Sequence, residues 1–307
     1  MNEEMKFCQS CGMPMQAAGD FGTETDGSPS GEYCVYCYKG GTFTGQGFDD
    51  YMKIFAIPSS ELASKSATFA LPKSAAGTEC SFYAVANYDA TSAKTQSALT
   101  SLLENSAGDY NGTFSEVTTA AKRSGGFVMS GQTTQTVGAV NSTTNVGITL
   151  KRTVAKVALQ TTIAPAFSEK YGGSLTINSV KLSKAASQST VIAGTPTPGA
   201  MSYTHTQTPA SASGKYNALF YLFENAALAA GNRVLLEINA TYDMDGSDTT
   251  TDDRSEVTYS VELTGKAAGD IQRNGYYRIA ANITGLVGQD CIAVSYTHLT
   301  LPTNSRV

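Results

Sequence analysis

Histidine is scarce in this chain, and tryptophan is absent. Its 307 residues include only two histidines, His205 in a Thr- and Pro-rich stretch and His298 near the C-terminus. A Ser/His/Asp or Cys/His arrangement needs histidine beside its nucleophile as a general base. The sequence therefore offers almost no material for nucleophilic catalysis, and we predict that the protein is not an enzyme.

Charged residues are few, and they are unevenly distributed. They make up 15% of the chain, and the net charge is −5. Residues 1–55 hold three lysines against eight acidic residues, which accounts for the whole excess, so the rest of the chain is balanced. Neither part has the basic face that binding to a phosphate backbone requires. We expect no nucleic-acid partner.

Long apolar runs are also missing. No stretch reaches the about 18 apolar residues that indicate a transmembrane helix. The N-terminal residues MNEEMKFCQS contain no apolar segment of the kind found in secretory signal peptides. From the sequence as written, we expect no transmembrane segment and a chain that stays in the cytosol.

The sharpest motif lies in the acidic N-terminal part. Cys8 and Cys11 form one C-x2-C pair, and Cys34 and Cys37 form a second. Two such pairs can supply four thiolates to a tetrahedral Zn²⁺ ion. Two disulfides or a thioredoxin-like redox pair are the alternatives, but a redox pair needs a βαβ context that is not visible here. We predict a structural zinc site, because four thiolates leave no open position for a catalytic water.

These residues also carry a resemblance. KFCQSCGMPM, DFGTETDG and EYCVYCYKGGTFT are similar to the small zinc-ribbon domain found at bacterial N-termini. The resemblance covers about residues 5–54. It implies a metal-stabilised module without a defined biochemical role.

The remainder of the chain has the alternating pattern of β-strands. Residues 217–223, NALFYLF, form a continuous apolar run typical of a strand buried on both faces. Residues 91–105 instead have helical spacing, with Thr91 or Ser92 placed to cap a helix. Three later segments have apolar residues at every second position, which predicts a strand in each. They run from Val234 to Tyr242, from Val257 to Leu263 and from Tyr277 to Ile283. Several short strands with polar turns indicate a β-sandwich.

The apolar phase changes within residues 147–160, GITLKRTVAKVALQ. Leu150 and Val154 fall on even positions, whereas Val157 and Leu159 fall on odd ones. A change of phase moves later side chains to the other face of a sheet. We interpret this stretch as a crossing between two β domains, with the first two residues in one core and the last two in the next.

An acidic loop follows the strand that ends near Tyr242. Its carboxylates could hold Ca²⁺, but DMDGSD lacks the full EF-hand spacing and its closing Glu. We favour a solvated hairpin. The acidic residues are Asp243, Asp245, Asp248, Asp252 and Asp253.

The body resembles the fimbrillin family of Bacteroidetes, the pilins with FimA-like and Mfa-like members. Five segments carry the resemblance in the family's order: ECSFYAVANYDA, FVMSG, GITLKRTVAKVALQ, FYLFEN and RNGYYRIAANITG. The resemblance covers about residues 56–288 and implies two tandem transthyretin-like β-sandwich domains. It also implies a cell-surface subunit of a fimbria that assembles with other pilin subunits by strand donation and contacts a host or bacterial surface ligand.

The chain departs from that family at both ends. The zinc ribbon stands where the exported leader would be, and residues 291–307, CIAVSYTHLTLPTNSRV, look like translated sequencing-adapter sequence. We therefore interpret the chain as a chimera joined near residues 53–58, with a genuine ribbon–pilin fusion as the alternative. In the chimera, the ribbon would be a cytosolic zinc-ribbon protein of unknown interaction role.

The sequence thus predicts a mainly β chain with a small zinc ribbon before two tandem sandwiches. The expected parts are 1–54, zinc ribbon; 55–78, linker and first strand; 79–154, a truncated N-terminal fimbrillin β domain; 155–288, a C-terminal β-sandwich domain; and 289–307, an artefactual or disordered tail.

Overall fold

A computed structural model describes residues 6–11, 14–44, 52–57, 59–105, 107–117, 121–194, 200–247, 249–286 and 291–300. Within these residues the chain is mainly β, as predicted, and its helices are short. None of the described helices is long and apolar enough to cross a membrane.

The chain divides into two compact units that interleave along the sequence. The first comprises residues 1–84, 89–102 and 132–148, and the second comprises 85–88, 103–131 and 149–307. The chain therefore passes between the units several times. The predicted domain limits at 79, 154 and 288 remain predictions.

The first unit begins with three small antiparallel hairpins. They are β1 (Lys6–Phe7) with β2 (Pro14–Met15), β3 (Phe21–Thr23) with β4 (Pro29–Cys34), and β5 (Tyr38–Lys39) with β6 (Thr42–Phe43). A three-stranded sheet, only part of which belongs to the first unit, has the order β10-β9-β7, formed by Lys151–Arg152, Met129–Thr136 and Glu79–Ala86.

The expected helix over residues 91–105 is shorter and starts later. Asp89 accepts hydrogen bonds from the N–H and the hydroxyl of Thr91 at 3.0 and 2.6 Å, which holds that residue in a turn. Thr95 is the N-cap instead, since its hydroxyl accepts the N–H of Ala98 at 3.1 Å. Helix α1 spans only Gln96–Thr100. The prediction of a cap at Thr91 or Ser92 was wrong.

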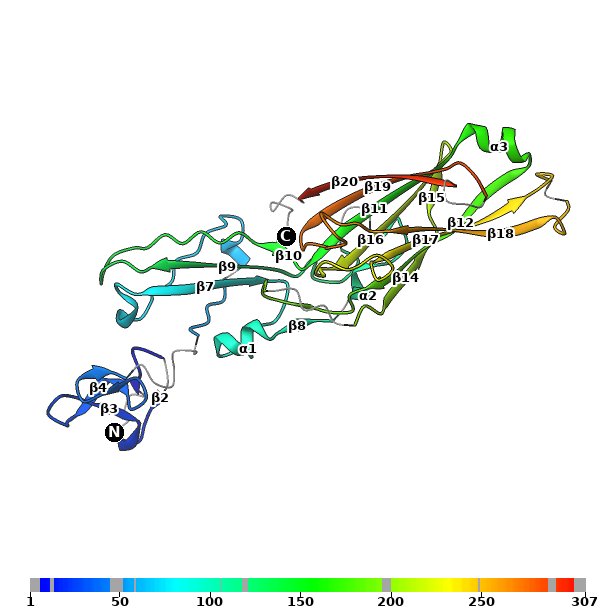
Figure 1. The fold of residues 1–307 in the computed structure, drawn as a ribbon. Helices are drawn as coiled ribbons and strands as arrows, with labels where there is room; N and C mark the ends of the chain where they lie inside the picture. The colour runs from blue at the N-terminus through cyan, green and yellow to red at the C-terminus, as the bar shows by residue number, and fades with distance from the viewer. Residues whose placement is uncertain are drawn as a thin grey trace. The chain divides into compact units, whose positions relative to one another are not determined.

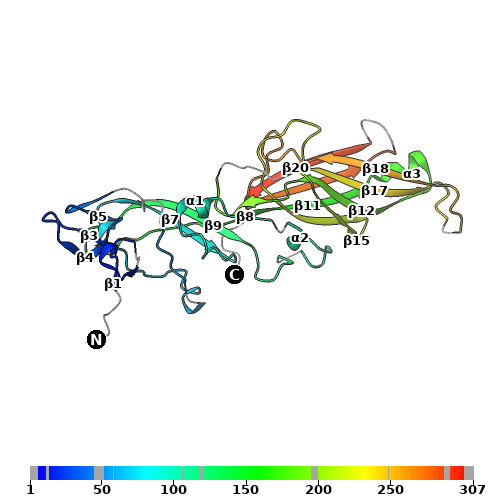
Figure 2. The ribbon, with the colours of Figure 1, turned by 90° about the horizontal axis from the view of Figure 1, so that it is seen from below.

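The second unit contains a β-sandwich. Its five-stranded sheet has the order β15-β16-β11-β19-β20, with strands Ala210–Ala212, Lys215–Phe223, Val154–Ile163, Gly275–Ile283 and Ile292–Thr300. Its four-stranded sheet has the order β14-β12-β17-β18, with strands Tyr203–Gln207, Ser174–Ala185, Leu235–Asp243 and Arg254–Glu262. Figures 1 and 2 show helix α3 (Pro165–Tyr171) at one end of this sandwich.

The main core lies between the two sheets. Strand β17 supplies Leu236, Ile238 and Ala240, all fully buried, and β11 supplies Val157 and Leu159 from the opposite sheet. These are the alternate positions that the sequence pattern predicts, because successive strand residues point to opposite faces. Strand β16 is buried on both faces from Ala218 to Phe223, as its continuous apolar run indicated.

A second cluster packs on the outer face of the five-stranded sheet. It contains Val154, Tyr221 and Phe223, covered by Tyr110 of helix α2 (Ala107–Tyr110) and by Val117. A short pair of strands, β8 (Leu103–Glu104) and β13 (Ser189–Thr190), also belongs to this unit. Val154 thus does face a different cluster from Val157, as the change of phase predicted.

The structure differs from the predicted crossing in two details. Residues 147–150 are not in a strand, and Leu150 is only half-buried and belongs to neither cluster. Both clusters lie within the second unit. The phase change therefore marks the start of β11, where Val154 and Ala155 are buried in different clusters on opposite faces of the sheet.

The expected disorder of residues 289–307 is wrong for Ile292–Thr300. These residues form β20, which pairs with β19 in nine antiparallel pairs, from Gly275 with Thr300 to Ile283 with Ile292. Ile292 and Val294 pack against the main core. The alternation has structural meaning because Ile292 and Val294 face the core while Ala293 and Ser295 are exposed. The strand also pairs backbone N–H and C=O groups of β19 that would otherwise form an open edge.

Candidate metal centre

The four cysteines predicted to bind zinc come together in the first unit. Their Sγ atoms all lie within 4.8 Å of one another. Cys8 follows β1, Cys34 ends β4 and Cys37 precedes β5, so short strands deliver the ligands from both C-x2-C turns.

Backbone hydrogen bonds hold the two turns together. The N–H of Gln9 donates to the carbonyl of Glu32 at 2.8 Å, which joins the first turn to β4. The N–H of Cys34 donates to the Sγ of Cys8 at 3.3 Å. The N–H of Cys37 donates to the carbonyl of Cys34 at 3.0 Å and closes the second turn. The ligand positions are therefore fixed by main-chain contacts.

Gly22 allows these strands to approach closely. A Cβ atom at this position would lie 2.4 Å from the carbonyl oxygen of Tyr38 and 2.9 Å from that of Cys34. Both neighbours are backbone atoms, which cannot swing away as a flexible side chain would. Any larger residue would push the second cysteine pair out of place.

The cysteines also form the core of this module. Cys8, Cys34 and Cys37 are buried together with Met15, which is 2% exposed. Met15 was not among the predicted core residues, although it lies in the FCQSCGMPM segment. Tyr33 packs against the cluster, whereas Tyr36 is 53% exposed. All four buried residues of this cluster therefore carry sulfur.

The sulfur positions suit a tetrahedral ion better than disulfides. The Sγ atoms of Cys11 and Cys34 lie 3.7 Å apart, and all six cysteines are free thiols. Four sulfurs placed about 2.3 Å from one Zn²⁺ ion lie roughly 3.8 Å apart, whereas a disulfide needs about 2.05 Å. The donor set therefore fits a four-coordinate zinc ion.

The environment shifts the pKa values of the Cys8 and Cys37 thiols in opposite directions. Burial acts to raise the pKa of Cys8, but hydrogen bonds from the backbone of Cys11, Cys34 and Ser10 outweigh it and lower the pKa to about 7. Burial raises the pKa of Cys37 above its ordinary value. Hydrogen bonds to sulfur favour the thiolate, which is the form that binds metal.

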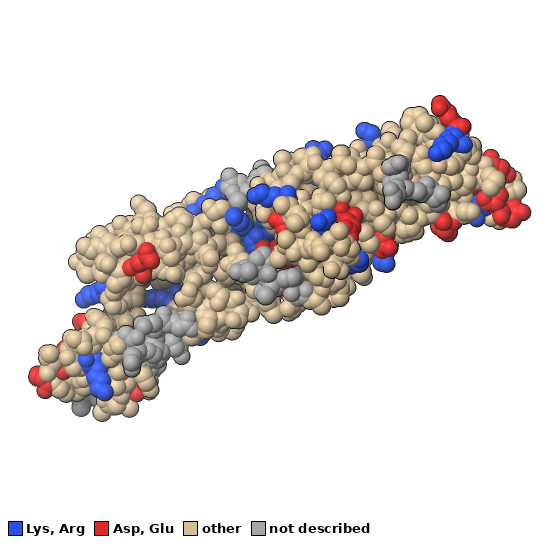
Figure 3. Space-filling view, in the orientation of Figure 1, with Lys and Arg blue, Asp and Glu red and all other residues tan. Residues whose placement is uncertain are grey.

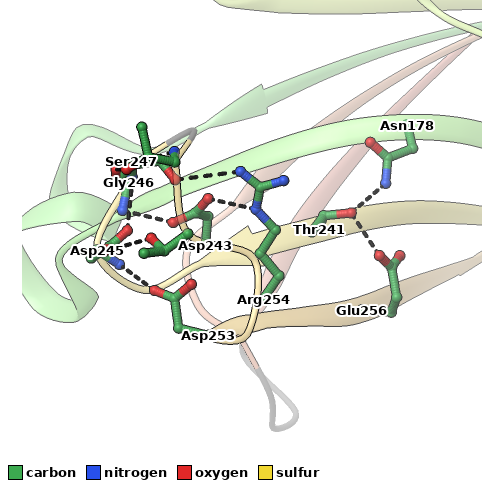
Figure 4. A network of polar contacts seen from close by, with 11 residues as sticks. Asn178, Thr241, Asp243, Asp245, Gly246, Ser247, Asp253, Arg254 and Glu256 are labelled. Carbon is green, nitrogen blue, oxygen red and sulfur yellow. Dashed lines mark hydrogen bonds and ion pairs between the residues drawn. The ribbon is translucent and has the colours of Figure 1, made fainter.

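The acidic loop forms a second group of converging side chains, in the turn between β17 and β18 (Figure 4). Asp243 accepts from the Nε of Arg254 at 2.8 Å and from the N–H of Gly246 at 2.7 Å. Asp245 accepts from the N–H of Ser247 at 2.7 Å. These contacts hold a hairpin, as predicted, and Asp248 lies outside the described residues. Acidic side chains gather at this end of the sandwich (Figure 3).

Both histidines are half-buried in the second unit. His205 lies with its Nε2 atom 3.0 Å from the carbonyl oxygen of Gly112 and its ring against Phe220. The ring of His298 packs on Tyr277 with centroids 4.7 Å apart. Both rings contribute to packing.

Comparison with known proteins separates the two parts of the chain. Residues 7–70 match the family model described as "Putative zinc ribbon domain". The match begins close to the start of the sequence resemblance, at residue 7, and extends beyond residue 54. No curated protein sequence matches the chain.

Solved structures resemble the β-rich body. A cell adhesion protein from Parabacteroides distasonis, described as putative, is 17% identical with a TM-score of 0.50, over 74% of this chain and 84% of that one. A second such protein from that organism is 12% identical with a TM-score of 0.51, over 73% and 77% of the two chains. A fimbrilin (fimA) from Porphyromonas gingivalis is 17% identical with a TM-score of 0.50, over 72% and 80%. The body has a fimbrillin-like fold.

Proposed function

We propose that the β-rich body is a structural subunit of a cell-surface fimbria, joined to other subunits by strand donation. Its fold likeness to a fimbrilin is the observation that carries this proposal. A pilin needs no catalytic residue, which agrees with the packing roles of both histidines. Its partners would be further pilin subunits and a ligand on a host or bacterial surface.

The edge of the five-stranded sheet supports strand donation. Strand β20 is bound to β19 along nine residue pairs, yet most of its side chains are exposed, including Tyr296 at 38% and Leu299 at 46%. Its attachment therefore rests mainly on backbone hydrogen bonds. A strand from another subunit could make the same bonds, because backbone pairing does not depend on side-chain identity.

A reversible covalent lock tests this proposal. Ala280 and Ser295 are paired across β19 and β20, and both side chains are exposed. We expect the zinc-loaded Ala280→Cys/Ser295→Cys double variant to stay monomeric when oxidised and to polymerise when reduced, as seen by electron microscopy and light scattering. Ser295→Cys alone is the matched control. Polymers of equal length from the locked and unlocked forms would exclude exchange at this edge.

We also infer that the N-terminal domain holds one structural Zn²⁺ ion through Cys8, Cys11, Cys34 and Cys37. The supporting observations are the four converging sulfurs and a core built around them. Zinc would link the two C-x2-C turns, and its binding free energy would become folding free energy. Native mass spectrometry should find one zinc ion per chain, and none after Cys34→Ser.

The alternative is a cytosolic zinc-ribbon protein to which the β-rich body was joined by sequence assembly. The observation behind it is chemical: a cluster of four free thiols suits a reducing compartment, whereas a pilin works outside the cell. Long reads of the source DNA across the codons for residues 52–58 and 288–293 would decide. One continuous locus would exclude the chimera.

A further inference from the structure

A hollow of about 430 Å³ lies on the outer face of the five-stranded sheet, over β16, β11, β19 and β20. Lys156, Ala158 and Gln160 of β11 line it, whereas Val157 and Leu159 between them belong to the main core. The hollow is therefore on the side of the sheet that faces away from the sandwich interior.

The register of three strands explains why the surface is hollow. Ala158 is opposite Arg278 of β19, and Gln160 is opposite Ala280. Ala280 is in turn opposite Ser295 of β20. Ala280 and Ser295 therefore place two small side chains opposite each other, and Ala158 lies diagonally across from Ala280. Longer side chains around them form the walls.

The charged residues among the described lining residues are all positive. Lys156 and Arg278 both line the hollow, and none of the described lining residues is acidic. The ammonium group of Lys156 lies 5.3 Å from the ring centre of Tyr276. Burial, with a contribution from Arg152, lowers the pKa of Lys156. A bound anion would relieve both effects by neutralising positive charge in a partly dry site.

Uncharged polar groups surround the two cations. Gln160 donates from Nε2 to the Oδ1 atom of Asn217 at 3.0 Å, which orients both amides along the wall. The remaining amide atoms can each donate or accept hydrogen bonds. Thr297 is the cross-strand neighbour of Arg278 and adds a hydroxyl. Phe114 adds a second aromatic ring to the lining.

We propose that this hollow binds a carboxylate-bearing sugar, such as a uronic or sialic acid unit. The planar guanidinium of Arg278 can bind a carboxylate through two parallel hydrogen bonds, and Lys156 supplies a second charge. The amides and hydroxyls match the alternating donors and acceptors of sugar hydroxyl groups, and the rings of Tyr276 and Phe114 offer apolar faces for the sugar ring. The volume lies in the range usual for small-molecule sites.

The two cations and the amide wall of this site lie on β11, β16 and β19, which strand exchange at β20 would leave in place, so either proposal can fail alone. It also differs from a general anion site. An inorganic phosphate ion needs only the two cations, whereas a sugar acid also needs the amide wall. The ligands compared in the test must therefore differ in charge and in the presence of the sugar ring.

The test is calorimetric titration of the full zinc-loaded chain with methyl glucuronide and with the methyl glycoside of N-acetylneuraminic acid. The neutral methyl glucoside and inorganic phosphate are the comparison ligands. We expect at least one acidic sugar to bind about tenfold or more tightly than either comparison ligand. Phosphate binding as tightly as the sugars would overturn the sugar assignment. If neither acidic sugar binds at concentrations of roughly 10 mM, the proposal is overturned.

Variants locate the binding. Arg278→Gln should weaken it by roughly tenfold or more, since one charge-assisted pair of hydrogen bonds is lost. Lys266→Gln is the matched control, because Lys266 is exposed and lies outside the hollow. Equal thermal melting curves of both variants establish that the fold is intact. If Arg278→Gln folds and binds as the unaltered chain does, the sugar binds elsewhere and the site is wrong.

Discussion

Arg273 and Glu224 form an ion pair inside the second unit, with the Nε of Arg273 donating to the Glu224 carboxylate at 3.0 Å. Their side chains are only 6% and 9% exposed. Arg273 also donates to the carbonyl oxygens of Thr190 and Val191 at 2.9 and 3.1 Å. One guanidinium thus joins the end of β16, the start of β19 and the segment at β13.

Removing one member of this pair should be costly. Arg273→Met leaves the Glu224 carboxylate buried without its partner, and we expect the free energy of unfolding to fall by about 3–5 kcal/mol. Native-state hydrogen exchange of amides in β11 and β19 measures the loss. The pair of Lys181 and Glu237, 3.2 Å apart, provides the control, because its side chains are far more accessible to solvent, at 44% and 26% exposed. Lys181→Met should cost under about 1 kcal/mol, and equal losses at the two sites would contradict this account.

A charge placed in the main core should unfold the sandwich. Val157 is fully buried, so Val157→Asp puts an unpaired carboxylate between the two sheets. We expect the second unit to lose its protected amides under native conditions. Gln160→Asp, three residues along β11 on its exposed face, should leave the hydrogen-exchange pattern nearly unchanged. If Val157→Asp affected the first unit first, the assignment of this strand would be wrong.

Stability should fall at high pH because buried tyrosines hold their protons. Burial raises the pKa of Tyr259 to about 12, and its hydroxyl donates to the carbonyl of Gly285 at 2.9 Å. Below pH 10, both folded and unfolded states keep the proton, so this contribution is complete. Between pH 10 and 12 only the unfolded state loses it, and the free energy of unfolding should fall by about 1.4 kcal/mol per pH unit for this group.

Tyr259→Phe isolates that contribution. The variant should show a shallower fall in stability between pH 10 and 12 when urea unfolding is repeated across that range. Tyr277, whose pKa burial also raises to about 12, remains in the variant and keeps part of the slope. An unchanged slope would mean that Tyr259 ionises equally in both states.

Local patterns predicted much of this fold. The alternation in residues 234–242 corresponds to the buried face of β17, because the period of two is a property of each strand by itself. The two C-x2-C pairs likewise predicted the cluster of four sulfur atoms, which the structure brings within 4.8 Å of one another. In both cases the decisive residues are close together in the sequence.

Long-range relationships were not predictable in the same way. FYLFEN and RNGYYRIAANITG were both recognised as segments, yet nothing local indicates that Glu224 of one pairs with Arg273 of the other. The hollow on the outer face also depends on register, since Ala158 lies opposite Arg278, and Gln160 opposite Ala280, only through the parallel pairing of β11 with β19. Strand β20 was mistaken for a disordered or artefactual tail, because its structural role is to pair with the edge of β19.

We expect a zinc-dependent ribbon and a zinc-independent β-sandwich to coexist in one chain. Hydrogen–deuterium exchange of the full chain, followed by mass spectrometry before and after removal of zinc with a chelator, tests this expectation. We predict that protection is lost in residues 8–44, whose core is the cysteine cluster, and kept in β11, β16 and β19. Loss of protection in the sandwich strands on chelation, or full protection of residues 8–44 without metal, would contradict the claim.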